Sequence, residues 1–335
     1  MFEGNDRGIL AWLGTVVLGM GLISGCAERQ QAVDLYLEAV MLRELGQDEA
    51  AVRQLKAAVA QDPDLVLAQS ELGRAYLALN EWELAVEAFR HAVRLDPWSF
   101  QDHMDLATAY EKLGRFRQAA QVFARAGELN AESLEAQLAA ARCYLGAGRP
   151  VQALVHCEAA RQIDPESEEA LRLLAKAYEG QKDYEQAALT YQQLLEDNPE
   201  RSEVAMALAM AHIKGEQYER AKDVLLGVIQ TRPDQSRAFR DLGYCLLKLG
   251  EADQAIAMYE KATVLDGADW EAYRGLGVAC MVKAQRTGDE ALQAAALRHW
   301  RRSLAIHPDQ PRRDWLEKLI KEHSHTTDPL RGFDD

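Results

Sequence analysis

Apolar and small residues recur along this chain with a period of 34 residues. Alanine occupies every thirty-fourth position from Ala51 to Ala255, and a second register of leucine or alanine runs from Leu72 to Leu242. The same spacing, or twice that spacing, separates five prolines: Pro63, Pro97, Pro165, Pro199 and Pro233. Self-similarity at a fixed period predicts a repeat protein in which each unit buries its apolar face against its neighbours.

The amino-acid content favours helices for these units. Alanine and leucine dominate the 335 residues, and only nine prolines are present. Alanine and leucine are strong helix formers, whereas proline interrupts a helix. Hydrophobic residues make up 48% of the chain and charged residues 27%, so the chain can bury a core and lacks the composition of a disordered protein.

The second unit carries the residues Leu72-Gly73, Tyr76, Ala85, Phe89, Ala92 and Pro97, and with them it resembles the tetratricopeptide repeat. Small residues at Gly73 and Ala85 would let two antiparallel helices approach closely, and Phe89 would fill the space between them. The resemblance covers nearly all of the chain after residue 31. It implies an all-α solenoid, a right-handed superhelix of antiparallel helix pairs, with repeats at 32–65, 66–99, 100–133, 134–167, 168–201, 202–235, 236–269 and 270–308.

The eighth repeat departs from the period in its second half. Ala296, Trp300 and Pro308 stand seven residues late, so we expect an insertion near residues 284–290 that lengthens the turn between the two helices. A capping helix is expected at 309–323, with Trp315, Leu316, Leu319 and Ile320 on one face that covers the last repeat. Residues 324–335 are expected to form a disordered tail.

Residues 1–25 are predicted to be a signal peptide. No charged residue occurs between Gly8 and Ala27, and residues 9–18 have the length and character of its apolar region. The run Ile23-Ser24-Gly25-Cys26 resembles the bacterial lipobox, which implies that the thiol of Cys26 is acylated and that the chain is cleaved before it. The alternative is an uncleaved transmembrane anchor, since roughly 20 uncharged residues can span a bilayer.

Both interpretations export the repeats and tether them to a membrane, with residues 26–31 as the lipidated cysteine and a short tether. Ala27, not aspartate, follows the cysteine. By the enteric sorting rule, this implies the periplasmic side of the outer membrane in a bacterial envelope.

In the tetratricopeptide family the fifth and ninth positions of each first helix face a concave groove. Six of these sixteen positions are basic here and none is acidic, although the chain has a net charge of −15. The candidate partner-binding residues are Arg74, Arg142, Arg172, Lys176, Met206, Met210, Arg240, Tyr244 and Arg274. The resemblance thus implies a cationic groove in which methionines, including Met104, provide apolar contacts. Such a groove is suited to an acidic peptide or a C-terminal carboxylate. The alternative is that these arginines pair with neighbouring carboxylates such as Asp105, Glu135, Glu169 and Asp241.

No phosphate-binding loop, nucleophile elbow, zinc-binding helix motif or dinucleotide fingerprint is present in the sequence. The acidic pI near 5.1 argues against nucleic acid as a partner. The cysteines form no CxxC pair and no Cys/His cluster with metal-ligand spacing, and four of them are expected to be buried. A Cys143–Cys157 disulfide is an alternative in an oxidising compartment. We therefore expect no catalysis, metal, cofactor or small-molecule substrate.

Together these features predict a membrane-anchored scaffold that holds a protein or peptide partner. In layout the chain resembles repeat lipoproteins that assist type IV pili, tight-adherence secretion or outer-membrane protein assembly. The alternative is an accessory subunit of an envelope polysaccharide or cell-wall synthase.

Overall fold

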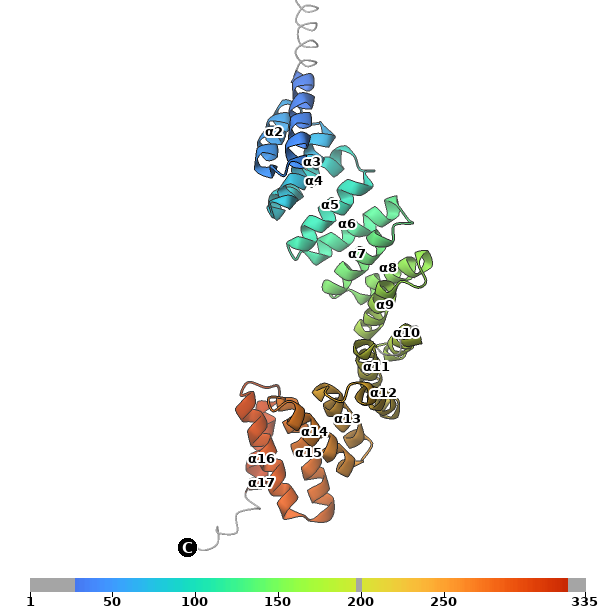
Figure 1. Cartoon of the computed structure of the whole chain (residues 1–335), viewed down its shortest axis with the longest axis vertical. Coiled ribbons are helices and arrows are strands. Elements are labelled where there is room, and N and C mark those ends of the chain that lie inside the picture. Colours follow the sequence, from blue (N-terminus) through green and yellow to red (C-terminus); the bar gives the residue numbers. More distant parts are fainter. Residues whose placement is uncertain (1–27, 197–200, 325–335) are drawn as a thin grey trace, which may run out of the picture. The chain divides into compact units, whose positions relative to one another are not determined.

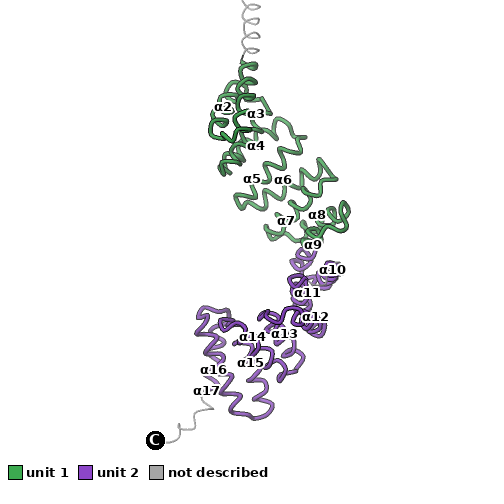
Figure 2. The backbone as a smooth tube through the Cα atoms, viewed as in Figure 1, with its two compact units in different colours: residues 1–173 green, residues 174–335 purple. Residues whose placement is uncertain are grey.

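The computed structural model describes residues 28–196 and 201–324, and these residues form helices joined by short turns (Figure 1). The prediction of an all-α tetratricopeptide fold is confirmed, because the helices pack in sequential antiparallel pairs. Cys26, the predicted signal peptide and residues 325–335 of the predicted tail lie outside the described residues, whereas Ser324, the first residue of that tail, is helical. The chain divides into two compact units, residues 1–173 and 174–335 (Figure 2).

The described part of unit 1 starts within a helix that includes residues 28–44 and continues through seven helices to the start of α9. These are α2 (Asp48–Gln61), α3 (Val66–Ala78), α4 (Trp82–Leu95), α5 (Phe100–Lys112), α6 (Phe116–Leu129), α7 (Leu134–Gly146) and α8 (Pro150–Ile163). Each helix from α2 to α8 packs on the next along the chain. The helix α9 (Glu168–Gly180) contains the boundary between the units.

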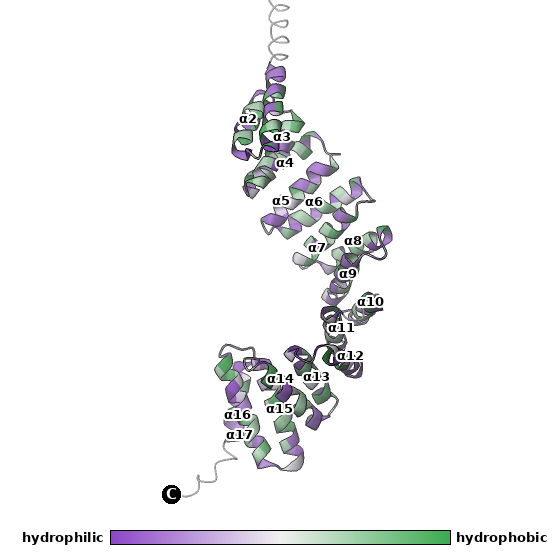
Figure 3. Cartoon of the chain, viewed as in Figure 1, coloured by the Kyte–Doolittle hydropathy of each residue, from purple (hydrophilic) through white to green (hydrophobic). Residues whose placement is uncertain are grey.

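Unit 2 continues with α10 (Tyr184–Glu196), α11 (Ser202–Lys214), α12 (Tyr218–Thr231), α13 (Ser236–Lys248), α14 (Ala252–Leu265), α15 (Trp270–Thr287), α16 (Glu290–Ile306) and α17 (Arg313–Ser324). The helices again pack in chain order, and α17 packs on α16. Ribbons such as those of α13 to α16 carry both green and purple turns in Figure 3, because each helix has an apolar and a polar face.

The close approach of the paired helices depends on glycine, as the sequence predicted. A Cβ at Gly73 would lie 2.6 Å from the ring of Phe89, which is fully buried. The same arrangement recurs in unit 2, where a Cβ at Gly277 would lie 2.4 Å from the ring of Trp300. A glycine in the first helix therefore admits a large aromatic residue from the second helix.

The turn inside each of the first seven repeats is set by a residue with positive φ at the same position of the period. Glycine occupies this position at residues 46, 114, 148 and 250, and Asn80, Lys182 and Glu216 occupy it in the other repeats. This left-handed conformation lets the chain leave one helix and enter the next within two or three residues.

The expected long turn in the eighth repeat is wrong. The inserted residues extend both helices, so that α15 has 18 residues and α16 has 17, compared with 13 and 14 in α13 and α14. The turn stays short because Gly288 adopts a left-handed conformation and Asp289 caps α16, accepting hydrogen bonds from the backbone N–H groups of Ala291 and Leu292.

The face of the capping helix also differs from the expectation. Leu316 is fully buried, and Leu319 and Ile320 pack against the same cluster as Trp300. Trp315 is 45% exposed and does not share this face. Consecutive helical residues point about 100° apart, and in this helix Leu316, Leu319 and Ile320 face the cluster whereas Trp315 points to its side.

Candidate functional site

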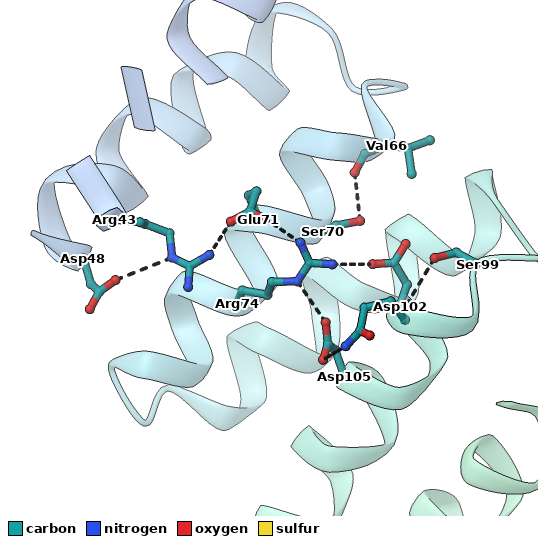
Figure 4. Close-up of polar contacts among 10 residues, drawn as sticks. Arg43, Asp48, Val66, Ser70, Glu71, Arg74, Ser99, Asp102 and Asp105 are labelled. Carbon is teal, nitrogen blue, oxygen red and sulfur yellow. Dashed lines mark hydrogen bonds and ion pairs between the residues drawn. The ribbon is translucent and has the colours of Figure 1, made fainter. Parts of the chain in front are cut away.

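In unit 1 the predicted groove residue Arg74 belongs to a network of ion pairs (Figure 4). Its Nε lies 2.9 Å from Oδ2 of Asp105, and its Nη2 lies 3.7 Å from Oδ1 of Asp102. Glu71 bridges Arg74 and Arg43. Burial acts to lower the pKa of Arg74, but the hydrogen bonds that Arg74 donates to the carboxylates of Asp105 and Glu71 outweigh it and raise this pKa.

The other predicted arginines of unit 1 also have carboxylate partners. Arg142 lies 3.6 Å from Glu111 and 3.5 Å from Glu169, and Arg172 lies 2.8 Å from Glu168 on its own helix. For Arg74, Arg142 and Arg172 the structure therefore agrees with the alternative that the groove arginines pair with neighbouring carboxylates.

Two of the methionines expected to provide apolar relief are part of the core. Met104 is 7% exposed and Met206 is 6% exposed. Both pack in the hydrophobic clusters, so neither presents an open apolar surface. Lys176 is exposed on α9.

Four of the nine candidate partner-binding residues, together with Val278 at a further groove position, line one cavity of about 490 Å³ in unit 2. Three consecutive first helices supply them: Met210 from α11, Arg240 and Tyr244 from α13, and Arg274 and Val278 from α15. Concave sites of this size with mixed apolar and polar walls are typical of ligand pockets. We call this cavity the unit 2 pocket.

The segment before and within α17 closes one side of the unit 2 pocket. Pro311, Arg312 and Trp315 line it, and none of them was a candidate from the sequence. They follow the last repeat, where the 34-residue period no longer assigns positions. The apolar pattern of residues 309–323 placed Trp315 on the packing face of the capping helix, so no sequence signal connected it with the groove.

Arg240 is held inside the protein by acidic side chains. Its Nη1 lies 2.8 Å from Glu271 and 3.2 Å from Asp269, and its Nε lies 3.2 Å from Asp241. Burial acts to lower the pKa of Arg240, but these three carboxylates raise it. Most of the positive charge of Arg240 is therefore neutralised within unit 2.

Arg274 has a different environment one repeat further along. Its guanidinium lies over the ring of Trp270, 4.8 Å from the centroid, and its Nη1 donates to the carbonyl oxygen of Pro311 at 3.4 Å. Burial lowers the pKa of Arg274, and the positive charge of Arg312 lowers it further, whereas Glu271 acts in the opposite direction. Arg274 thus contacts a ring and a carbonyl, and Glu271 is engaged by Arg240.

Aromatic side chains form the apolar wall and the floor of the unit 2 pocket. Tyr244 is 38% exposed and meets Tyr218 edge to face at 6.1 Å. Tyr259 is 3% exposed and reaches the pocket beside Gly275, where a Cβ would lie 2.4 Å from its ring. The glycine at position 275 therefore allows a buried phenol to form part of the floor.

The remaining chemistry of the described residues is limited. Cys143, Cys157, Cys245 and Cys280 are free and buried, so the alternative Cys143–Cys157 disulfide is absent. Burial raises the pKa of the Cys143 and Cys157 thiols to about 12, which keeps them protonated and poorly nucleophilic. Within residues 28–196 and 201–324, no cluster of side chains could hold a metal ion, and no helix is long and apolar enough to cross a membrane.

Models of the tetratricopeptide repeat match most of the chain. Those described as "Tetratricopeptide repeat" match residues 144–211, 104–168, 240–311 and 66–97, and one described as "TPR repeat" matches 39–80. A model described as "Anaphase-promoting complex, cyclosome, subunit 3" matches 180–262. The chain is a tetratricopeptide repeat protein, and such proteins are generally non-catalytic scaffolds that bind protein or peptide partners.

Solved structures with the same repeat resemble the chain at low sequence identity. A tetratricopeptide repeat protein from Parabacteroides merdae ATCC 43184 is 16% identical with a TM-score of 0.47, covering 75% of this chain and 99% of that one. YrrB, described as "a TPR protein with an unusual peptide-binding site", is 21% identical with a TM-score of 0.47, covering 61% and 99%. MamA from Desulfovibrio magneticus RS-1 is 20% identical with a TM-score of 0.47, covering 53% and 96%. No curated protein matches the sequence significantly.

Proposed function

We propose that this protein is a non-catalytic scaffold that holds a peptide segment of a partner protein in the unit 2 pocket. The observation that carries the proposal is the convergence of five groove positions, from three successive first helices, on one cavity of about 490 Å³. A cavity of this size takes one or two side chains of an extended peptide, while the rest of the peptide lies along the first helices.

The pocket provides both kinds of contact that peptide recognition needs. Met210, Tyr244 and Val278 supply apolar surface, and arginine side chains supply directional hydrogen-bond donors. Unit 1 offers a peptide fewer hydrogen-bond donors than unit 2, because the groove arginines of unit 1 are already paired with carboxylates of the chain.

Selection of peptides tests this function. A phage-displayed library of random octapeptides is selected on the full-length chain in detergent, and the recovered peptides are measured by fluorescence anisotropy. Tyr244→Ala is expected to weaken their binding about tenfold, while Leu226→Ala, which removes an exposed side chain from α12 outside the pocket, leaves it unchanged. Recovery of no peptide, or equal binding by wild type and Tyr244→Ala, would contradict the proposal.

We propose further that the scaffold is tethered by an acylated Cys26 on the periplasmic side of a bacterial envelope membrane, with the outer membrane favoured. The support is the run Ile23-Ser24-Gly25-Cys26 at the end of the uncharged segment. An exposed apolar stripe adds to it, because Leu37, Met41 and Leu45 follow one another at helical spacing and are 52%, 64% and 71% exposed. This stripe would contact the membrane or a membrane-bound partner.

The lipid anchor is tested with Cys26→Ser in a bacterial host fed a clickable fatty acid. The variant is expected to remain an uncleaved precursor and to lose the acyl label. Processing and acyl labelling of Cys26→Ser equal to those of the wild type would exclude a lipid anchor at Cys26.

The process that the scaffold serves is proposed to be assembly of an envelope, secretion or pilus complex. The layout of signal peptide, lipobox and repeats supports this choice over an accessory role in a polysaccharide or cell-wall synthase. Affinity purification from membranes separates the two: secretion or pilus components would support assembly, and a synthase would overturn it.

A further inference from the structure

The unit 2 pocket contains three arginines, but the chain neutralises only one of them. Arg240 is paired with Asp241, Asp269 and Glu271, and Glu271, which also lines the pocket, acts to raise the pKa of Arg274. Among the described residues, neither Arg274 nor Arg312 forms an ion pair within 4.0 Å. The pocket therefore keeps two cations without a carboxylate partner in a chain whose net charge is −15.

These two cations are close enough to affect one another. The charge of Arg312 contributes to the lowered pKa of Arg274, and both side chains line the same cavity. Two like charges that share a partly buried cavity repel each other, so an anion placed between them is stabilised.

The backbone of Arg312 is also unusual. It has φ of 65°, and the other described non-glycine residues with positive φ, Asn80, Lys182 and Glu216, all occupy the turn position inside a repeat. Arg312 instead directly precedes α17, and its carbonyl oxygen accepts the backbone N–H of Leu316 at 3.1 Å. A bulky side chain is disfavoured in the left-handed region, so a strained arginine at the rim of a cavity points to a role for its side chain.

The hydroxyl group of a largely buried tyrosine completes the site. Tyr259 is 3% exposed and lines the pocket, and its hydroxyl forms no hydrogen bond with the described residues. Burial raises its pKa, so the hydroxyl stays protonated. An acceptor bound in the pocket would take a hydrogen bond from this hydroxyl.

We propose that the unit 2 pocket recognises a peptide in which a carboxylate side chain lies beside an apolar one. The carboxylate is bound by Arg274, Arg312 and the hydroxyl of Tyr259, and the neighbouring apolar side chain packs against Tyr244 and Trp315. Arg312 and Trp315, which lie after the last repeat, complete the site. The inference rests on the proposed function. Arginine donates paired N–H groups to a carboxylate, and the exposed rings of Tyr244 and Trp315 offer the apolar contact.

The probe is the set of octapeptides recovered with the wild-type chain, blocked at both ends so that no terminal carboxylate contributes. We expect one position to be enriched in aspartate or glutamate next to an aromatic or aliphatic position. Replacing that acid by its amide is expected to weaken binding at least about tenfold. A peptide with phosphoserine at this position is measured in parallel, and tighter binding than the carboxylate peptide would overturn the carboxylate assignment.

Arg312→Gly separates a binding role from a structural one. Glycine adopts a φ of 65° without strain, so the variant is expected to melt at the same or a higher temperature than the wild type, yet to bind the acidic peptide about tenfold more weakly. Arg312→Glu is expected to reverse the preference at the acidic position toward lysine. The control Arg298→Glu makes the same change of charge at an exposed position of α16 outside the pocket and is expected to leave binding unchanged.

The outcomes distinguish this inference from the proposed function. If peptides bind and Tyr244→Ala weakens them, but the acid and amide peptides bind equally, the carboxylate site is wrong and the peptide scaffold stands. If Arg312→Gly binds like the wild type, Arg312 has no part in the site and the inference fails. If no peptide is recovered at all, the proposed function fails first.

Discussion

The ring of Tyr259 lies so close to the backbone of Gly275 that a Cβ at position 275 would come within 2.4 Å of it. The two residues belong to different repeats, since Tyr259 is in α14 and Gly275 is in α15. The contact lets the phenol pass the helix and reach the unit 2 pocket. A glycine that the repeat pattern does not require thus shapes the floor of the site.

Gly275→Ala is therefore expected to destabilise unit 2 by about 1–3 kcal/mol, because Tyr259 is buried and its ring cannot move away without disturbing its neighbours. Gly227→Ala is the matched control, since a Cβ at Gly227 in α12 meets nothing within 4 Å. That change should be neutral or stabilise by up to about 1 kcal/mol. Urea denaturation followed by circular dichroism measures both, and equal effects would show that the contact with Tyr259 is unimportant.

The helix pairs could be predicted from the sequence because each depends on local residues at fixed spacing. Gly73 and Phe89 stand at set positions of the repeat, so their contact follows from the period. The eighth repeat was predicted less well. The residues between Ala284 and Glu290 could extend a helix or lengthen a turn, and the caps at Gly288 and Asp289 decide between them.

The site was harder to predict than the fold, because ion pairs depend on side-chain directions that the period does not fix. Arg74, Arg240 and Arg274 occupy groove positions of the same pattern, yet Arg74 and Arg240 are neutralised and Arg274 is not. Arg312 and Trp315 lie beyond the last repeat, so no position in the pattern marked them.

In unit 1, Arg74→Ala is expected to destabilise the fold by about 1–3 kcal/mol. The change leaves Asp105 without its guanidinium partner and Glu71 with Arg43 alone, and it leaves Asp102, which is 3% exposed, as a buried carboxylate without a cation. The figure is below that of a fully buried pair because the Arg74 side chain is 31% exposed.

Arg142→Ala is the control for Arg74. Its partners Glu111 and Glu169 lie 3.5 Å or more away, and the arginine side chain is 51% exposed, so the loss should not exceed about 1 kcal/mol. Thermal unfolding at low and high salt checks this difference. A loss for Arg142→Ala as large as that for Arg74→Ala would mean that burial of the partners does not determine the effect.

The stability of unit 1 is expected to fall as the pH drops below 6.5. His156 stacks on Tyr144 with ring centroids 5.3 Å apart, and its Nδ1 lies 2.8 Å from Oε1 of Gln137. Burial lowers the pKa of His156, although the charge of Glu128 acts in the opposite direction. The unfolded chain then binds a proton at a higher pH than the folded chain, so stability is complete above pH 6.5 and is lost as the pH falls through the folded pKa.

His156→Phe keeps the ring and removes the titration. Its stability should therefore differ less between pH 7.5 and pH 5.5 than that of the wild type, as measured by urea denaturation at each pH. His91→Phe, at an exposed position, is the control and should retain the wild-type pH dependence. If His156→Phe shows the same pH dependence as the wild type, other groups cause the acid sensitivity.

The two neighbouring residues Trp315 and Leu316 of α17 should have opposite effects when replaced by alanine. Leu316 is fully buried in the cluster that contains Trp300, so Leu316→Ala should cost about 2–5 kcal/mol and loosen α17 from α16. Trp315 is 45% exposed at the pocket, so Trp315→Ala should change the melting temperature little and weaken peptide binding several-fold.

Melting curves and anisotropy titrations with one acidic peptide measure both effects on the same samples. If Trp315→Ala unfolds the protein as readily as Leu316→Ala, then Trp315 is a packing residue and the face expected from the sequence was correct. If Trp315→Ala is stable and also binds normally, α17 only covers the last repeat, and the pocket is built by the repeats alone.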